Sequence, residues 1–146
     1  MTARRLLRIA AILSLLHFLG HSAGAPWTPS EGGATATVIG GMKSFRFDVL
    51  GSARTYWDFY QGFGLTVSVF LLLEAALLWL LAGLAREEPA RVRPFVVAFL
   101  VANVVRLALI VRFFFLPPLV LSAGTTLCLA LATWAAGRRE AAAATA

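Results

Sequence analysis

The chain has 146 residues, of which 60% are hydrophobic and 14% are charged, with a mean hydropathy of +0.81. Soluble domains carry about 25% charged residues, so this composition excludes an ordinary soluble fold. The net charge of +6 would suit a nucleic-acid-binding protein, but the basic residues flank the apolar segments, so nucleic acid is not an expected partner.

Four apolar segments follow one another and, with their connections, occupy the whole chain as one integral membrane domain, residues 1–146. Each is near the roughly 20 residues with which a helix crosses about 30 Å of hydrocarbon. They predict an all-α fold, a transmembrane four-helix bundle with an extracytoplasmic loop at residues 26–58. The predicted spans cover residues 6–25, 60–85, 94–114 and 116–136.

Eight arginines lie at one set of segment ends and predict the orientation. By the positive-inside tendency, both termini and the connection at residues 86–93 are cytoplasmic. We expect an integral protein of the bacterial inner (cell) membrane, with anionic lipid headgroups as partners of the inner arginines. A protein partner or a second copy of the chain is a further expectation. The arginines are Arg4, Arg5, Arg8, Arg86, Arg91, Arg93, Arg138 and Arg139.

The first segment also has the three parts of a secretory signal peptide: a basic start, an apolar run and the small residues Ala23, Gly24 and Ala25. Cleavage after Ala25 would leave three spans. Retention is favoured because the apolar stretch is long enough to cross the membrane and keeps the number of spans even. N-terminal sequencing of the mature chain distinguishes the two.

The outer loop contains two short segments with strand-like composition. Residues 34–39 are small and β-branched, and residues 45–49 alternate between apolar and charged side chains. Together they predict a short β-hairpin between the first and second spans.

Aromatic residues are concentrated at 56–60, where the chain enters the membrane again. Such rings favour the membrane–water interface, so an aromatic anchor is the favoured interpretation. The alternative is that Asp58 and Tyr60, together with Arg112, form the mouth of an inward-facing cavity.

Three polar residues interrupt the second and third spans at similar predicted depths. Counted from the inner ends of their helices, Glu74 and Asn103 differ by roughly 3 Å at 1.5 Å per residue, and Arg106 is one turn higher. A charge facing lipid costs at least about 2.5–3.5 kcal/mol. The sequence therefore predicts a Glu74–Arg106 ion pair, supported by Asn103, inside the bundle.

Two histidines, His17 and His21, are four residues apart on the first span and project to one side of a helix. Such a pair could hold a metal or haem. However, the chain has no other histidine, and its single cysteine, Cys128, is isolated in the fourth span. The favoured interpretation is therefore that the two histidines form hydrogen bonds between helices, and no metal is predicted. We place both histidines with the intramembrane polar cluster as candidate ligand-binding residues.

The outer run resembles small bacterial four-span membrane proteins in the size class of DoxX-like proteins. The residues that carry this resemblance are Met42-Lys43, Gly51, the segment 57–60 and the segment 62–64. The resemblance implies a four-helix bundle and no particular activity. No phosphate-binding glycine loop, nucleophile elbow or zinc-protease motif occurs in the sequence.

Three classes of function agree with these features, and the sequence leaves open whether the chain is an enzyme. The leading class is a structural or accessory membrane subunit with a buried polar cluster. The second is a membrane-embedded enzyme or binder for a lipid-like or quinone-like molecule, with Glu74 and His17 exchanging protons. The third is a small-solute or proton-coupled transporter. The sequence assigns no cofactor and no substrate.

Overall fold

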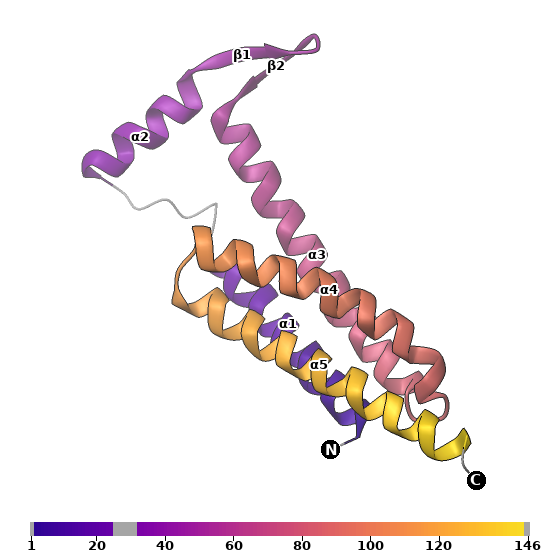
Figure 1. The fold of residues 1–146 in the computed structure, drawn as a ribbon. Helices are drawn as coiled ribbons and strands as arrows, with labels where there is room; N and C mark the ends of the chain where they lie inside the picture. The colour runs from indigo at the N-terminus through magenta and orange to yellow at the C-terminus, as the bar shows by residue number, and fades with distance from the viewer. Residues whose placement is uncertain (1, 25–31, 145–146) are drawn as a thin grey trace. The chain divides into compact units, whose positions relative to one another are not determined.

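The computed structural model describes residues 2–24 and 32–144, and 85% of the structure is helical (Figure 1). The described residues form five helices and one two-stranded hairpin. Their order is α1 (Ala3–Gly24), α2 (Gly33–Ser44), β1 (Arg46–Val49), β2 (Ser52–Thr55), α3 (Tyr56–Leu84), α4 (Pro89–Phe113) and α5 (Leu116–Ala144).

Four of these helices are long and apolar enough to cross a membrane. They are α1, α3, α4 and the part of α5 from Leu116 to Arg138. Many of their large apolar side chains lie outside the helix contacts, among them Phe70 and Leu80, each 63% exposed. Such exposure is unfavourable in water and favourable in lipid. The prediction of a membrane protein with four apolar helices is therefore confirmed.

The chain forms two compact parts, residues 1–17 with 71–146 and residues 18–70. In the first part, α1, α3, α4 and α5 all contribute to one hydrophobic core. Its residues recur at intervals of three and four along each helix, as expected for one buried face. They are Leu6, Leu7, Ala10, Ala11, Leu78, Ala82, Ala85, Val92, Val96, Leu129 and Ala132.

Small residues bring the helices of the first part close together. Five of the eleven core residues are alanines, and small side chains let helix backbones approach closely in membrane proteins. Gly124 of α5 packs closely against α1, because a Cβ there would be 3.1 Å from Cδ1 of Leu13.

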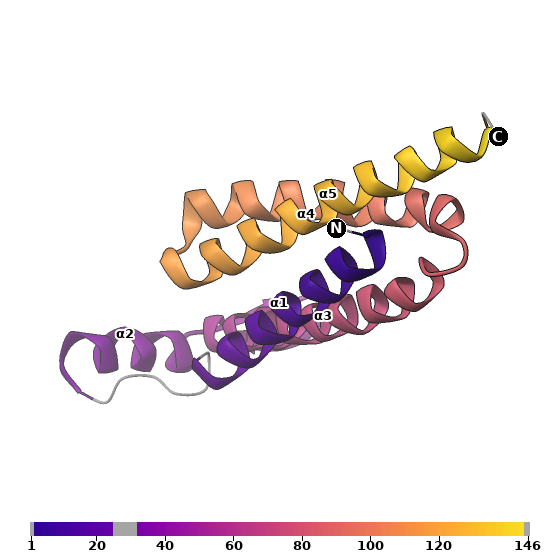
Figure 2. The same ribbon diagram turned by 90° about the horizontal axis from the view of Figure 1, so that it is seen from below.

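Helices α4 and α5 pack against each other as antiparallel neighbours, as Figure 2 shows. Only Phe114 and Phe115 separate them. The last turn of α4 is closed by the amide of Phe114, which donates to the carbonyl of Ile110 at 2.9 Å. Pro117 and Pro118 follow in the first turn of α5, where a missing backbone N–H costs no helical hydrogen bond.

In the second part, β1 and β2 form an antiparallel hairpin in which Arg46 pairs with Thr55 and Val49 with Ser52. Leu50 and Gly51 make the two-residue turn, with positive φ angles of 53° and 80°. An isolated two-stranded hairpin is only marginally stable. Here aromatic contacts join it to α3, since the ring of Phe47 lies 4.9 Å from that of Tyr56 and 5.9 Å from that of Phe59.

The predicted strand at residues 34–39 is wrong, because this segment belongs to helix α2. The predicted strand at residues 45–49 is present as β1, but its partner is β2, which lies two residues further on. A two-residue turn closes a hairpin at less entropic cost than a longer connection. With no strand left to pair with, residues 34–39 satisfy their backbone groups within a helix.

The helix boundaries differ from the predicted spans at several ends. Helix α3 begins four residues before residue 60, and α4 begins at Pro89 rather than at residue 94. A helix can extend beyond its apolar segment when the flanking residue suits the first helical turn. Pro89 suits this position in α4, because the missing N–H of a proline costs no helical hydrogen bond there. Residues 25–31 lie outside the described residues. Residue 25 ends the predicted first span and would precede the signal-peptide cleavage site, and residues 26–31 belong to the predicted loop.

Candidate functional site

A buried carboxylate on α3 is the centre of the candidate site. Glu74 lies on the same helix face as Leu71 and Leu78, and it is only 7% exposed. That face packs into the first part of the chain, so the hydrophobic pattern of α3 forces the carboxylate into the interior. A carboxylate buried in this way needs donors for its oxygens.

Helix α4 supplies two of these donors. The Nδ2 atom of Asn103 donates to Oε1 of Glu74 at 2.5 Å, and a guanidinium nitrogen of Arg106 donates to Oε2 at 2.6 Å. Arg106 also donates to Oδ1 of Asn103 at 2.5 Å. Since Asn103 and Arg106 are three residues apart, they share one face of α4 and can reach the same carboxylate.

Helix α1 supplies the third donor, Ser14, whose hydroxyl donates to Oε2 of Glu74 at 3.3 Å. Ser14 is fully buried. Ser14 was not among the residues expected from the sequence to join the site. A signal existed, because Ala10, Ser14 and His17 follow one another at intervals of four and three, which places them on one face of α1.

These four residues, Ser14, Glu74, Asn103 and Arg106, form a polar cluster that connects α1, α3 and α4. Both oxygens of the carboxylate accept hydrogen bonds, and the opposite charge of Arg106 is in direct contact. Charge-assisted hydrogen bonds of this kind are roughly twice as strong as neutral ones. The cluster therefore offsets the cost of placing one carboxylate inside the helix contacts.

Arg106 is the least enclosed member of the polar cluster. Its side chain is 28% exposed, whereas that of Glu74 is 8% exposed. The Nε atom of Arg106 is nevertheless buried and has no hydrogen-bond partner. One donor of the guanidinium thus remains available inside the protein.

The two histidines have different surroundings. His17 is buried on α1, one turn from Ser14. In the second part of the chain, Nε2 of His21 lies 2.9 Å from the carbonyl oxygen of Gly64. A carbonyl only accepts, so His21 must donate through Nε2, and this nitrogen is not free to bind a metal. Residues 2–24 and 32–144, which the structure describes, contain no group of three or more His, Cys, Asp or Glu side chains placed to hold a metal ion.

Asp58 has a local role at the start of α3. Its carboxylate accepts from the amide of Thr55 at 2.8 Å, while its own amide donates to the hydroxyl of Thr55 at 3.1 Å. This reciprocal pair is a capping box, which satisfies two amides that the first turn leaves unpaired. This capping box was not among the features expected from the sequence.

The other residues of the predicted cavity mouth make contacts with neighbouring rings. The ring of Tyr60 stacks on Trp57 with centroids 5.4 Å apart, and the guanidinium of Arg112 lies 5.2 Å from the ring of Phe113. Asp58 and Tyr60 belong to the second part of the chain and Arg112 to the first. A cavity mouth that joins them stays a prediction.

Comparison of the chain with models of protein families, with curated proteins and with solved structures finds no match. A functional conclusion therefore depends on the helices and the polar cluster themselves.

Proposed function

We propose that this protein is a small structural or accessory subunit of a membrane assembly, in which the polar cluster fixes the register of the helices. The observation that carries the proposal is the carboxylate of Glu74, which accepts from Ser14 on α1 and from Asn103 and Arg106 on α4. One side chain thus fixes three helices at one level.

A register role follows from the energetics of polar groups between apolar helices. Apolar faces slide past one another at little cost, because lipid and leucine side chains are equally apolar. A shift of α4 by one turn would move Asn103 and Arg106 by about 5.4 Å and leave the buried carboxylate with Ser14 as its one remaining donor among these three. That misaligned state would be strongly disfavoured.

We further propose that the assembly lies in a bacterial inner membrane with both chain termini in the cytoplasm. The support is the distribution of arginines, which lie in the first turns of α1, in the connection from α3 to α4 and the first turns of α4, and at the end of the apolar part of α5. In this orientation the hairpin faces the opposite side.

A double-mutant cycle at Glu74 and Arg106 tests the register role. We expect Arg106→Leu to lower the free energy of unfolding by about 3–5 kcal/mol, because it leaves the buried carboxylate of Glu74 without its partner. Glu74→Leu should cost less, because the guanidinium that it leaves unpaired is partly exposed. The double variant should recover much of this loss, since it buries no uncompensated charge. Thermal or denaturant unfolding of the purified protein in detergent measures the three effects.

The matched control is Arg112→Leu, which removes an arginine that is on the same helix but outside the polar cluster. It should change stability by less than about 1 kcal/mol, as for an exposed charge. A double variant that is as unstable as the sum of the two single variants would contradict a register role for the ion pair.

A second candidate is a binder for a lipid-like or quinone-like molecule, and the observation that favours it is Arg106. Its side chain is partly exposed, and its buried Nε has no hydrogen-bond partner, so the guanidinium has a donor to offer to a carbonyl oxygen. Native mass spectrometry of the purified protein tests this candidate. A copurified small molecule that is lost in Arg106→Leu would favour the binder over the structural subunit.

A further inference from the structure

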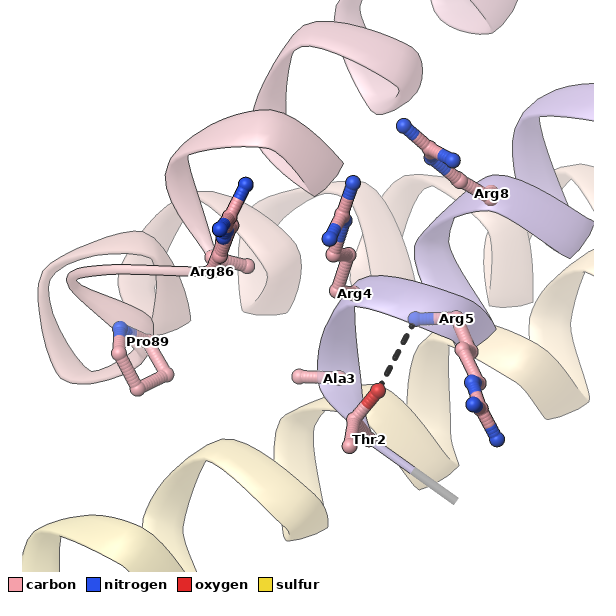
Figure 3. A pocket seen from close by; sticks show the side chains of 8 residues that line it. Thr2, Ala3, Arg4, Arg5, Arg8, Arg86 and Pro89 are labelled. Carbon is pink, nitrogen blue, oxygen red and sulfur yellow. Dashed lines mark hydrogen bonds between the residues drawn. The ribbon is translucent and has the colours of Figure 1, made fainter.

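A pocket of about 390 Å³ lies where the N-terminal end of α1 meets the connection from α3 to α4, all within the first part of the chain (Figure 3). Four of its lining residues are arginines: Arg4, Arg5 and Arg8 from α1, and Arg86 from the connection. This four-arginine pocket contains no acidic residue, and its volume is within the range of ligand sites in proteins.

The positive charges of the pocket have no carboxylate partner among the side chains that the structure describes. Within residues 2–24 and 32–138, no carboxylate forms an ion pair with any of the four arginines. The nearby Glu88 is already paired with Arg91, at 2.7 Å. Like charges that converge without a counter-charge repel one another, so an anion bound among them is favoured.

The arginine side chains are arranged so that several of them can contact one anion. In Figure 3, Arg4, Arg8 and Arg86 extend their guanidinium groups to the same side, whereas Arg5 extends away from them. The planar donors of guanidinium groups match the oxygens of a phosphate. The N-terminus of α1 adds the positive end of a helix dipole.

Arg8 is held in place by an aromatic ring and has a buried N–H donor without a hydrogen-bond partner. The guanidinium of Arg8 lies 4.9 Å from the ring of Trp79, a cation–π contact that restrains it. Its Nε atom is buried and has no hydrogen-bond partner. A buried donor without a partner is unfavourable unless a ligand or water satisfies it.

The pocket is at a boundary between polar and apolar surface. The ring of Trp79, which contacts Arg8, is 49% exposed, and Ile9, which follows Arg8 in the chain, is 38% exposed. A phosphate in the pocket would therefore have apolar protein surface beside it, as the phosphate of a membrane lipid requires for its acyl chains.

From these observations we propose that the four-arginine pocket binds the phosphate of an anionic phospholipid headgroup. This is a defined site, beyond a general attraction of basic residues to the membrane surface. It does not depend on the polar cluster around Glu74, so either proposal can fail without the other.

Lipid titration of the full-length protein in neutral detergent, followed by native mass spectrometry, tests the site. Phosphatidylglycerol should bind and phosphatidylcholine should not compete with it. The variant Arg4→Gln/Arg86→Gln should weaken phosphatidylglycerol binding about tenfold or more, because charge-assisted hydrogen bonds to the phosphate are lost.

The matched control is Arg91→Gln/Arg138→Gln, which removes the same charge outside the pocket and should change binding less than about twofold. Equal losses in the two double variants would overturn the proposal in favour of general charge attraction. If Arg4→Gln/Arg86→Gln does not fold, Arg86→Gln is compared with Arg91→Gln, since both positions are exposed and near the same connection.

A second arm separates a lipid headgroup from free phosphate, which has the same chemistry. Inorganic phosphate in excess over the lipid should displace phosphatidylglycerol only weakly, because it lacks acyl chains that contact the apolar surface. Full displacement at equal concentrations would overturn the lipid assignment and identify a site for free phosphate.

Discussion

Leu50 at the tip of the hairpin has a backbone conformation that disfavours its side chain. Its φ angle is 53°, and the side chain is fully exposed, so no packing offsets the strain. We expect Leu50→Gly to stabilise the hairpin by about 0.5–1 kcal/mol, because glycine adopts positive φ without a steric penalty. Slower hydrogen exchange at the amides of the paired residues Phe47 and Arg54 would show this.

The control for this prediction is Leu50→Val, which places a β-branched residue at the same φ angle. It should accelerate exchange at the same two amides, because branched side chains are least compatible with positive φ. Equal exchange in the two variants would mean that the turn conformation does not limit the stability of the hairpin.

The sequence predicts the contacts of some residues better than those of others. Glu74, Asn103 and Arg106 could be matched by depth, because an unpaired charge in an apolar helix must find a partner at its own level. Ser14 was missed because a serine in an apolar segment can also bond to its own helix backbone. The ligand-binding role of the cluster stays a prediction, since convergence of polar groups serves structure and binding equally.

At the scale of the helices, the contact between α1 and α5 depends on Gly124. A Cβ at this position would be 3.1 Å from the side chain of Leu13, which is tight but could be relieved by a small movement. The larger Gly124→Val should force the helices apart and lower the free energy of unfolding by about 1–3 kcal/mol. Thermal unfolding in detergent measures the loss.

Gly83 of α3 provides the matched control, because a Cβ there meets nothing within 4 Å. Gly83→Val should therefore cost less than Gly124→Val. The additional substitution Leu13→Ala should recover part of the loss at Gly124, since it provides space for the new side chain. No recovery would show that the contact with Leu13 is not the cause.

The helices and the loop were predictable to different degrees. The four spans follow from long apolar runs, which have few alternatives once soluble folds are excluded. In the loop, residues 34–39 and 45–49 both had strand-like composition, but only the second has a partner within a two-residue turn. Whether a segment forms a strand depends on the presence of a partner strand to pair with. The amino-acid composition of the segment alone does not indicate this.

The contacts of α1 in the core bear on whether the first span is retained or cleaved as a signal peptide. Leu6, Leu7, Ala10 and Ala11 belong to the hydrophobic core, and Ser14 donates to Glu74. Loss of α1 would expose the facing side chains of α3 and α5 and remove one donor from the carboxylate. These contacts support our prediction that the first span is retained.

For the whole molecule, the distribution of arginines predicts one orientation in the membrane. From the positive-inside tendency we expect the connection between α3 and α4 in the cytoplasm and the hairpin outside. Cys128 is the one cysteine of the chain, so a Cys128→Ala background permits labelling at single positions. Leu50→Cys and Glu88→Cys suit this purpose, because both side chains are exposed.

In intact cells, a membrane-impermeant maleimide should label Leu50→Cys and should label Glu88→Cys only after the membrane is permeabilised. Both variants should react equally in detergent, which controls for the reactivity of the thiol. The expected asymmetry has a physical basis, since arginines such as Arg86, Arg91 and Arg93 near Glu88 favour an anionic leaflet and resist transfer across a bilayer. Labelling of Glu88→Cys from outside intact cells would reverse the orientation and place the four-arginine pocket on the outer surface.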